Sequence, residues 1–279
     1  MSSRRDIEIR LSSLDEIKEI MNAMKNLSLM EVHKLARFLE SQRRVIESIG
    51  AAAADFLQFH RSEFLNVEKF RDLFLLVGSE RGFCGDFNEA VIRAFATYGA
   101  SAVQKSVVVV GARLAAKLGG DARLRAAIDG ASTVEEVDAV LVKLMLALTS
   151  PSVPSASEGP LRLTVLHHQP DAEPVAVTIL QPLQSASPKN TRFAHAPRLY
   201  LTPQSFLTGL VEQYLFAELH EILYSSLMAE NQRRMQNMDS AVRRLEKTSA
   251  ELLRKRNSLR QEEITEEIEI IMLSVGALE

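Results

Sequence analysis

A glycine-rich loop offers the clearest place for chemistry in this 279-residue sequence. Gly78, Gly82 and Gly85 lie in the stretch VGSERGFCGDFN, between a predicted strand and a predicted helix. Loops in this position bind phosphate when their backbone N–H groups and the helix N-terminus point at the anion. The spacing G-x3-G-x2-G matches neither the dinucleotide fingerprint nor the P-loop, and no lysine comes directly after the last glycine. We therefore predict a tight strand-to-helix turn here, with no bound nucleotide.

The other candidates for catalysis, one cysteine and six histidines, form no recognisable constellation. Cys84 lies in the same loop, but no histidine is near it in the sequence, so we expect a packed thiol rather than a nucleophile. His167 and His168 are adjacent on a predicted strand, where consecutive side chains point to opposite faces. No other histidine has a partner at metal-ligand spacing. The sequence therefore predicts no catalytic residue, no cofactor and no metal.

Composition excludes several further classes of protein. The formal net charge is −3, so overall charge does not favour nucleic-acid binding. No apolar run reaches the 18 or so residues that a membrane span needs, and we expect no insertion into a membrane. The N-terminus contains acidic residues and no apolar core, unlike a secretory signal. A single cysteine excludes an intramolecular disulfide and fits a reducing compartment.

The last quarter of the chain carries an uneven distribution of charge. Residues 230–260 contain nine cations against four acids, and residues 262–269 contain five glutamates. We call the cations the basic run: Arg233, Arg234, Arg243, Arg244, Lys247, Arg254, Lys255, Arg256 and Arg260. Such a run is ordinarily a solvated helix face. Arg256 and Glu263, however, fall on the apolar positions of the heptad pattern, so the helix must there face something other than a simple apolar partner.

Two long segments without proline, one toward each end of the chain, predict long helices over about 3–58 and 205–275. The basic run lies in the second. In the first, apolar residues recur at alternating three- and four-residue spacing, interrupted by Ser28, Glu31 and Gln42. They are Leu14, Ile17, Met21, Met24, Leu35, Phe38, Val45 and Ile49. The second carries Met235, Met238, Val242, Leu245, Leu252 and Leu259, after which the register slips and resumes with Ile264, Ile268, Ile271 and Val275. Because a compact middle separates the two stripes, we predict that the helices pack antiparallel.

The middle of the chain reads as α/β. Short valine-rich runs at 71–79 and 105–112 end in glycine, as strands buried on both faces of a parallel sheet do. A helical pattern over 89–98 lies between them and gives a βαβ unit, and another covers 133–148. The segments LRLTVLHHQ and EPVAVTILQP read as paired strands. We expect a mainly parallel sheet within about 70–200.

Three motifs together resemble the gamma subunit family of F-type ATP synthases, the rotary central shaft. The final helix matches the family pattern E-x3-R-M-x2-M-D-x-A at Glu230, Arg234, Met235, Met238, Asp239 and Ala241. It then matches N-x2-R-Q-x2-I-T-x-E at Asn257, Arg260, Gln261, Ile264, Thr265 and Glu267. The loop resembles S-[DE]-x-G-[LF]-C-G-x-x-N at Ser79, Glu80, Gly82, Phe83, Cys84, Gly85 and Asn88. The first segment keeps the family's A-M-K at Ala23, Met24 and Lys25, and the motifs follow in the family's order.

The resemblance implies an α/β fold class: a long antiparallel coiled coil of the N- and C-terminal helices plus a central Rossmann-like α/β domain. The expected domains are an N-terminal coiled-coil helix at 1–60, the central domain at 70–202 and a C-terminal coiled-coil helix at 203–279. The implied function is that of a non-catalytic rotor subunit, which couples ion-driven rotation of a membrane ring to ATP synthesis or hydrolysis in other subunits. The implied partners are the alpha and beta subunits around the shaft, the epsilon subunit and the membrane c-subunit ring. The implied location is peripheral, at the cytoplasmic face of the bacterial inner membrane.

The resemblance also implies which residues contact the alpha and beta subunits. They are Arg260, Gln261, Thr265, Glu267, Met24, Lys25, Arg243, Arg244 and Lys247. The first helix departs from the family's usual lysine-rich, small-residue pattern, because it is more acidic and bulkier here. The transported ion is left open.

Two other functions are open to the same sequence. A coiled-coil scaffold with an α/β head and no rotary role predicts an apolar stripe that continues to the end of the last helix. A nucleotide-binding enzyme using the 78–85 loop needs a phosphate-binding lysine or a ribose-binding acid, and the sequence places neither.

Overall fold

The structure is a computed structural model that describes residues 4–60, 71–99, 106–149, 161–172, 175–180, 195–196 and 198–276. The chain divides into two compact units. Unit 1 combines the two ends of the chain, Met1–Ser28 and Met235–Glu279, and unit 2 is the continuous stretch Leu29–Arg234.

Unit 2 is built on a five-stranded sheet in the order β3-β2-β1-β4-β5. The strands are β1 (Arg71–Val77), β2 (Ser106–Val110), β3 (Leu124–Ile128), β4 (Leu161–His167) and β5 (Ala176–Leu180). The first four run parallel, and β5 pairs antiparallel with β4. This confirms the mainly parallel sheet and the paired last strands. Strand β3 was not predicted, because its short sequence LRAAI is interrupted by Arg125 and contains an apolar run of only three residues.

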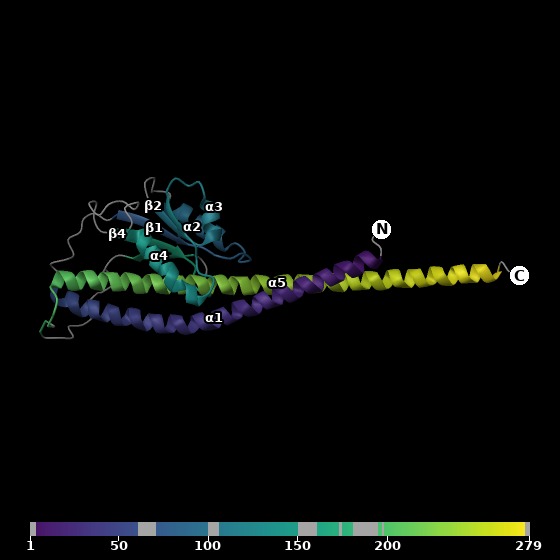
Figure 1. Cartoon of the computed structure of the whole chain (residues 1–279), viewed down its shortest axis with the longest axis horizontal. Helices are drawn as coiled ribbons and strands as arrows, with labels where there is room; N and C mark the ends of the chain where they lie inside the picture. The colour runs from purple at the N-terminus through teal and green to yellow at the C-terminus, as the bar shows by residue number, and fades with distance from the viewer. Residues whose placement is uncertain are drawn as a thin grey trace. The chain divides into compact units, whose positions relative to one another are not determined.

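Helices cover both faces of the sheet (Figure 1). The helices α2 (Phe87–Gly99) and α3 (Ala112–Leu118) pack on one face. On the other face lie α4 (Val137–Thr149), preceded by the 3-10 turn η2 (Val134–Glu136), and the long helix α5 (Pro203–Gly276). Every residue of β2 is buried, which explains its unbroken run of valines. The sheet is therefore the middle layer of a doubly wound α/β unit.

The two long helices are α1 (Arg4–His60) and α5 (Pro203–Gly276), each an uninterrupted element. They run antiparallel in both units. In unit 2, the rings of Phe56 and Phe206 lie 4.9 Å apart, and Gln42 Nε2 donates to the Ala217 carbonyl at 3.0 Å. In unit 1, Lys25 Nζ donates to Asp239 at 3.0 Å, and Arg4 Nε lies 3.3 Å from Glu263 Oε2. The predicted fold class is confirmed.

The buried stripe of α1 differs in part from the predicted one. Every position at alternating three- and four-residue spacing from Ile7 to His60 is buried or half-buried. Leu14, Met21, Leu35 and Ile49 belong to this stripe, as predicted, and Met24 beside it is half-buried. The prediction was wrong for the other three: Ile17, Phe38 and Val45 are 43%, 48% and 45% exposed.

Polar residues on the stripe caused this error. Lys18, Lys25, Ser28 and Gln42 occupy stripe positions, while apolar residues stand one position away from several of them. Ser28, predicted as an interruption, is 3% exposed. Because both sets of positions have the same three-four spacing, periodicity alone could not separate them.

The buried stripe of α5 agrees with the prediction. Buried or half-buried positions recur at the same spacing from Met235 to Leu259, and Arg256 occupies one of them. After Leu259 the pattern ends: every residue from 260 to 272 is exposed. The resumed stripe at Ile264, Ile268 and Ile271 is therefore exposed in the described part of the chain.

Candidate functional site

The exposed end of α5, residues 261–272, which we call the tip, carries an uncovered apolar stripe. Ile264, Ile268 and Ile271 are 44%, 52% and 61% exposed. Because successive helical residues are about 100° apart, these three side chains lie on one face. Stripes of this kind are normally buried against a partner.

Four predicted contact residues flank that stripe. On the same helical geometry, Arg260 and Glu267 lie at one edge of the stripe, and Gln261 and Thr265 lie at the other. All four are exposed. Thr265 Oγ1 donates to the Gln261 carbonyl at 2.8 Å, a bond within the helix. Among the described residues, no ion pair is found for Arg260 or Glu267. The four residues thus lie on the two sides of the isoleucine stripe and do not form a single cluster.

Lys25 and Arg243 meet at a shared carboxylate. Asp239 accepts from Lys25 Nζ at 3.0 Å through one oxygen and lies 3.0 Å from Arg243 Nη2 through the other. The hydrogen bond from Lys25 and the positive charge of Arg243 lower the pKa of Asp239. Met24 beside them is half-buried. Lys25 and Arg243 therefore already have an intramolecular partner.

The basic run does not form one surface. Arg244 and Lys247 are exposed, and the Arg243 side chain is 78% exposed. Arg256 is half-buried on the α5 stripe, whereas Arg234 is only 5% exposed. The run is therefore a mixture of solvent-facing and interior cations.

The glycine-rich loop is held by hydrogen bonds to groups of the chain itself. Gly78 N donates to the Val110 carbonyl at 2.9 Å, and Ser79 N donates to Asn88 Oδ1 at 2.9 Å. The next two amides, of Glu80 and Arg81, each donate to the Glu230 carboxylate at 3.2 Å. The amides of a loop that could bind phosphate thus bind a carboxylate from α5.

A second carboxylate, that of Glu80, accepts hydrogen bonds from the neighbouring turns. Glu80 Oε2 accepts from Ala112 N, at the start of α3, at 2.9 Å and from Gly130 N at 2.6 Å. Gly78 permits this close packing, because a Cβ there would lie 2.3 Å from Leu114 Cβ. Gly111 has a φ of +109°, which an L side chain rarely adopts. The predicted tight strand-to-helix turn is present, and the absence of nucleotide binding stays a prediction.

Arg234 binds both Glu230 and the backbone of the loop. It pairs with Glu230 one helical turn earlier, and both side chains are buried. Arg234 Nε donates to the Gly82 carbonyl at 3.3 Å, and Nη1 donates to Asn231 Oδ1 at 2.8 Å. Burial raises the pKa of Glu230, whereas the Arg234 charge and the loop amides oppose that rise. Sequence reasoning assigned Glu230 and Arg234 to a motif but did not find their partner, since the loop lies about 150 residues away.

Cys84 and the two central histidines are packed as interior residues. Burial, followed by the Glu230 charge, raises the pKa of Cys84 to about 11, which favours the protonated thiol. His167 Nε2 bonds with Thr178 Oγ1 at 3.0 Å, and His168 Nε2 bonds with the Phe87 carbonyl at 2.9 Å. Within the described ranges, no group of three or more His, Cys, Asp or Glu side chains could hold a metal ion.

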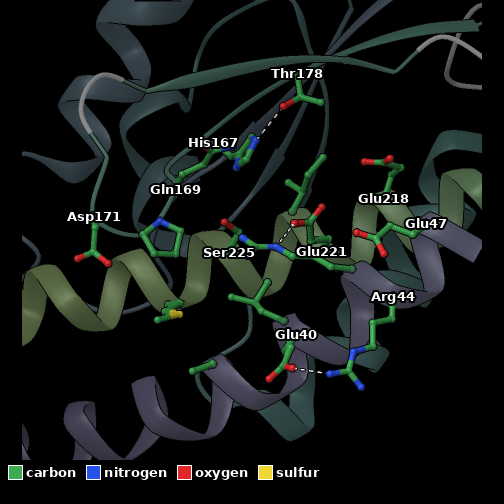
Figure 2. Close-up of a pocket in the computed structure, with 16 residues that line it drawn as sticks. Glu40, Arg44, Glu47, His167, Gln169, Asp171, Thr178, Glu218, Glu221 and Ser225 are labelled. Carbon is green, nitrogen blue, oxygen red and sulfur yellow. Dashed lines mark hydrogen bonds and ion pairs between the residues drawn. The ribbon is translucent and has the colours of Figure 1, made fainter. Parts of the chain in front are cut away.

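Unit 2 also contains a polar cleft of about 830 Å³ between α1, α5 and the turn after β4 (Figure 2). Both arginines that line it are paired within the chain, Arg43 with Glu221 and Arg44 with Glu40. Burial raises the pKa of Glu218, a further lining residue. None of the predicted contact residues lines this cleft.

The described helices include none that is both long enough and apolar enough to cross a membrane.

Fold and surfaces together define an α/β protein with an antiparallel pair of long helices, the longer of which is exposed over residues 260–272. The chain belongs to the ATP synthase family, whose model matches residues 3–278. Curated relatives include the ATP synthase gamma chain of Pelotomaculum thermopropionicum, 23% identical over 299 residues and covering 100% of both chains. That of Caldanaerobacter subterraneus is 25% identical over 290 residues and covers 95% of this chain and 96% of the relative.

Solved structures with the same fold come from mitochondrial ATP synthases. A chain from the OSCP/F1/c-ring structure of the Euglena gracilis enzyme has a TM-score of 0.62 at 15% identity, covering 99% of this chain and 94% of that one. A chain from the central stalk/c-ring structure of the Tetrahymena thermophila enzyme has a TM-score of 0.57 at 14% identity, covering 80% and 99%.

Proposed function

We propose that this chain is the central-stalk gamma subunit of an F-type ATP synthase, and that it couples rotation of a membrane ring to ATP synthesis or hydrolysis. The observation that carries the proposal is the tip, which continues past the N-terminal end of α1 with an uncovered apolar stripe flanked by polar residues. Pairing of Arg4 with Glu263 marks where α1 ends along α5. Full-length similarity to chains named ATP synthase gamma chain supports the same conclusion.

The chain itself makes and breaks no bond in this role. The tip turns inside an apolar sleeve formed by three alpha and three beta subunits, with its isoleucine stripe against apolar side chains. Arg260, Gln261, Thr265 and Glu267 hydrogen-bond to one alpha or beta subunit at a time. Because the tip differs from face to face, each rotational position favours a different conformation in each beta subunit, and nucleotide affinity in turn favours one position.

The remaining partners follow from the same family membership. Unit 2 contacts the epsilon subunit and the c-subunit ring, and the chain is peripheral at the cytoplasmic face of the bacterial inner membrane. Met24, Lys25, Arg243, Arg244 and Lys247 lie in unit 1 with the tip, which supports their assignment to the alpha and beta contact.

Co-purification tests the proposal. An affinity-tagged chain, produced with the alpha and beta subunits of its own organism, should co-purify with both and stimulate their ATP hydrolysis. The matched variant is Ile264→Ser/Ile268→Ser/Ile271→Ser, which changes the tip stripe and leaves unit 2 intact. We expect the variant to recover less complex. Self-association of the tagged chain without alpha or beta would instead support a coiled-coil scaffold.

A further inference from the structure

The buried pair Glu230–Arg234 occupies a special position along α5. Arg234 is the last residue of unit 2, and the helix continues without a break at Met235 into unit 1. Any force carried along α5 toward the sheet of unit 2 therefore reaches the turn that carries this pair.

Glu230 accepts hydrogen bonds from the backbone of the loop, and Arg234 donates one to it. The Glu230 carboxylate accepts from two successive loop amides, those of Glu80 and Arg81. Arg234 donates to the carbonyl of Gly82, the next residue in the loop. One helical turn thus contacts three consecutive backbone units of the loop. We call this set of contacts the Glu230 junction.

The loop is in turn fixed to the sheet. Ser79 N donates to Asn88 Oδ1 in α2, and Asn88 Nδ2 donates back to Ser79 Oγ. The Glu80 carboxylate accepts from the start of α3 and from Gly130, which follows β3. A continuous chain of hydrogen bonds therefore leads from α5 into the elements around three strands.

Directional bonds resist rotation better than apolar contacts do. Elsewhere in unit 2, α5 packs on the sheet through Leu219, Ile222, Leu223 and Leu227, and such contacts are non-directional. Its polar contacts with this unit also include exposed partners, Asp138 for His220 and Asp171 for Gln232. At a helix radius of about 5–6 Å, a turn of roughly 30° about the helix axis moves a side chain by about 3 Å. That displacement takes a hydrogen bond well beyond its range.

We propose that Glu230 and Arg234 are positioning residues that fix the rotational angle of α5 against the α/β unit and so transmit torque between them. This inference rests on the proposed function as a rotor subunit. It assigns to the glycine-rich loop a mechanical task in place of nucleotide binding.

The test uses the complete complex, including its membrane sector, in sealed vesicles. Glu230→Gln keeps the side-chain volume but removes the charge and one acceptor oxygen. The control is Glu40→Gln, which removes an exposed glutamate paired with Arg44 at the same four-residue spacing. ATP hydrolysis and ion transport are measured on the same vesicles, and the ratio of ions transported to ATP hydrolysed is compared.

We expect Glu230→Gln to hydrolyse ATP at about the wild-type rate, because the tip is unchanged, and to transport fewer ions per ATP. Loss of one charged hydrogen bond should open the junction at least about ten-fold more often, and the ratio should fall below that of the wild type. Glu40→Gln should keep the wild-type ratio. A merely structural role lowers the yield of complex but leaves the ratio unchanged, and that outcome would overturn the proposal.

Arg234→Lys covers the case in which Glu230→Gln does not assemble. It keeps the charge beside Glu230 and loses the forked bonds to Gly82 and Asn231, so a lowered ratio is again expected and a wild-type ratio again contradicts the inference. Failure of the wild-type chain to assemble with alpha and beta would instead contradict the proposed function.

Discussion

Arg234 and Arg243 belong to the same basic run, yet their surroundings give them different tasks. Arg234 is buried beside Glu230 and bonds to a loop carbonyl. The Arg243 side chain is 78% exposed and shares Asp239 with Lys25. Removing one partner of a buried pair costs about 3–5 kcal/mol, whereas exposed pairs are worth about 0.2–1 kcal/mol. At the scale of single residues, burial decides which cations matter for stability.

His167 gives the first prediction at this scale. Burial lowers its pKa from 6.5 to about 4, so the fold holds the imidazole neutral. Because the folded-state pKa is depressed, its stabilising contribution is complete above about pH 6.5 and is lost as the pH falls toward 4. The free energy of unfolding should therefore drop by about 2–3 kcal/mol more in the wild type than in His167→Gln between pH 7 and 4.5.

Denaturant unfolding of the isolated chain at a series of pH values measures this difference. The matched control is His33→Gln, at an exposed position of α1, which should follow the wild-type pH dependence. A His167→Gln curve parallel to that of the wild type would contradict the prediction.

Arg260 and Gln261 give the second prediction at this scale. A hydrogen bond to a charged group is worth about 1.5–3 kcal/mol. If the bond of Arg260 to an alpha or beta subunit forms in the rate-limiting step, Arg260→Ala should slow ATP turnover by about one to two decades. Gln261→Ala, at the other edge of the tip stripe, should slow it less. Steady-state hydrolysis by the assembled complexes measures both effects, and wild-type rates in both variants would remove these residues from the contact.

The long helices show how an element is defined by what it packs against. The α5 stripe from Met235 to Leu259 is buried or half-buried, and the same helix is exposed from residue 260 onward. Both parts are helical in the structure. Among the described residues the difference between them is the packing of α1, so at the scale of elements the tip is the part of α5 that extends beyond α1.

Charge reversal on α5 provides a prediction at this scale. Arg243→Glu/Arg244→Glu/Lys247→Glu should reduce assembly with the alpha and beta subunits most at low salt, because exposed pairs are screened as ionic strength rises. The yield of complex at a series of salt concentrations measures the effect.

Arg243 needs a separate control, since its reversal also places a second acid beside Asp239. Arg244→Glu/Lys247→Glu leaves that pair intact and should show most of the same salt-dependent defect. If the triple variant assembles normally at low ionic strength, the exposed part of the basic run is only a solvated face.

At the scale of the whole molecule, the two units differ in how they are stabilised. Unit 2 buries a large apolar core on one face of its sheet and a second core on the other. Unit 1 contains the two ends of the chain and includes the exposed tip. A single long helix without a packed face is marginally stable in water. Assembly should therefore stabilise the tip far more than it stabilises unit 2.

Hydrogen exchange tests this expectation. Backbone amides of residues 261–272 should exchange rapidly in the isolated chain and slow by more than about ten-fold on assembly with alpha and beta. Amides of residues 219–230, which pack on the sheet, should be slow in both states. Strong protection of the tip in the isolated chain, or no change on assembly, would contradict a tip that is covered only by partner subunits.

The sequence by itself determined the long helices, the α5 stripe and the α/β middle. These features depend on local properties: the scarcity of helix breakers, the three-four spacing from Met235 to Leu259, and the valine runs of buried strands. The motifs around Glu230 and Arg260 also follow from linear spacing. A local pattern suffices in each case, because one helix or strand expresses it without reference to distant residues.

Only the tertiary structure decided which side of α1 is buried and what Glu230 binds. Ile17 and Lys18 both fit a three-four pattern with Leu14 and Met21, and only the position of α5 selects Lys18. Glu230 and the amides of the 78–85 loop are far apart in the chain, and only the packing of α5 on the sheet brings them within hydrogen-bond distance. Long-range pairing depends on how several elements pack at once, and residue spacing within a single element does not contain that information.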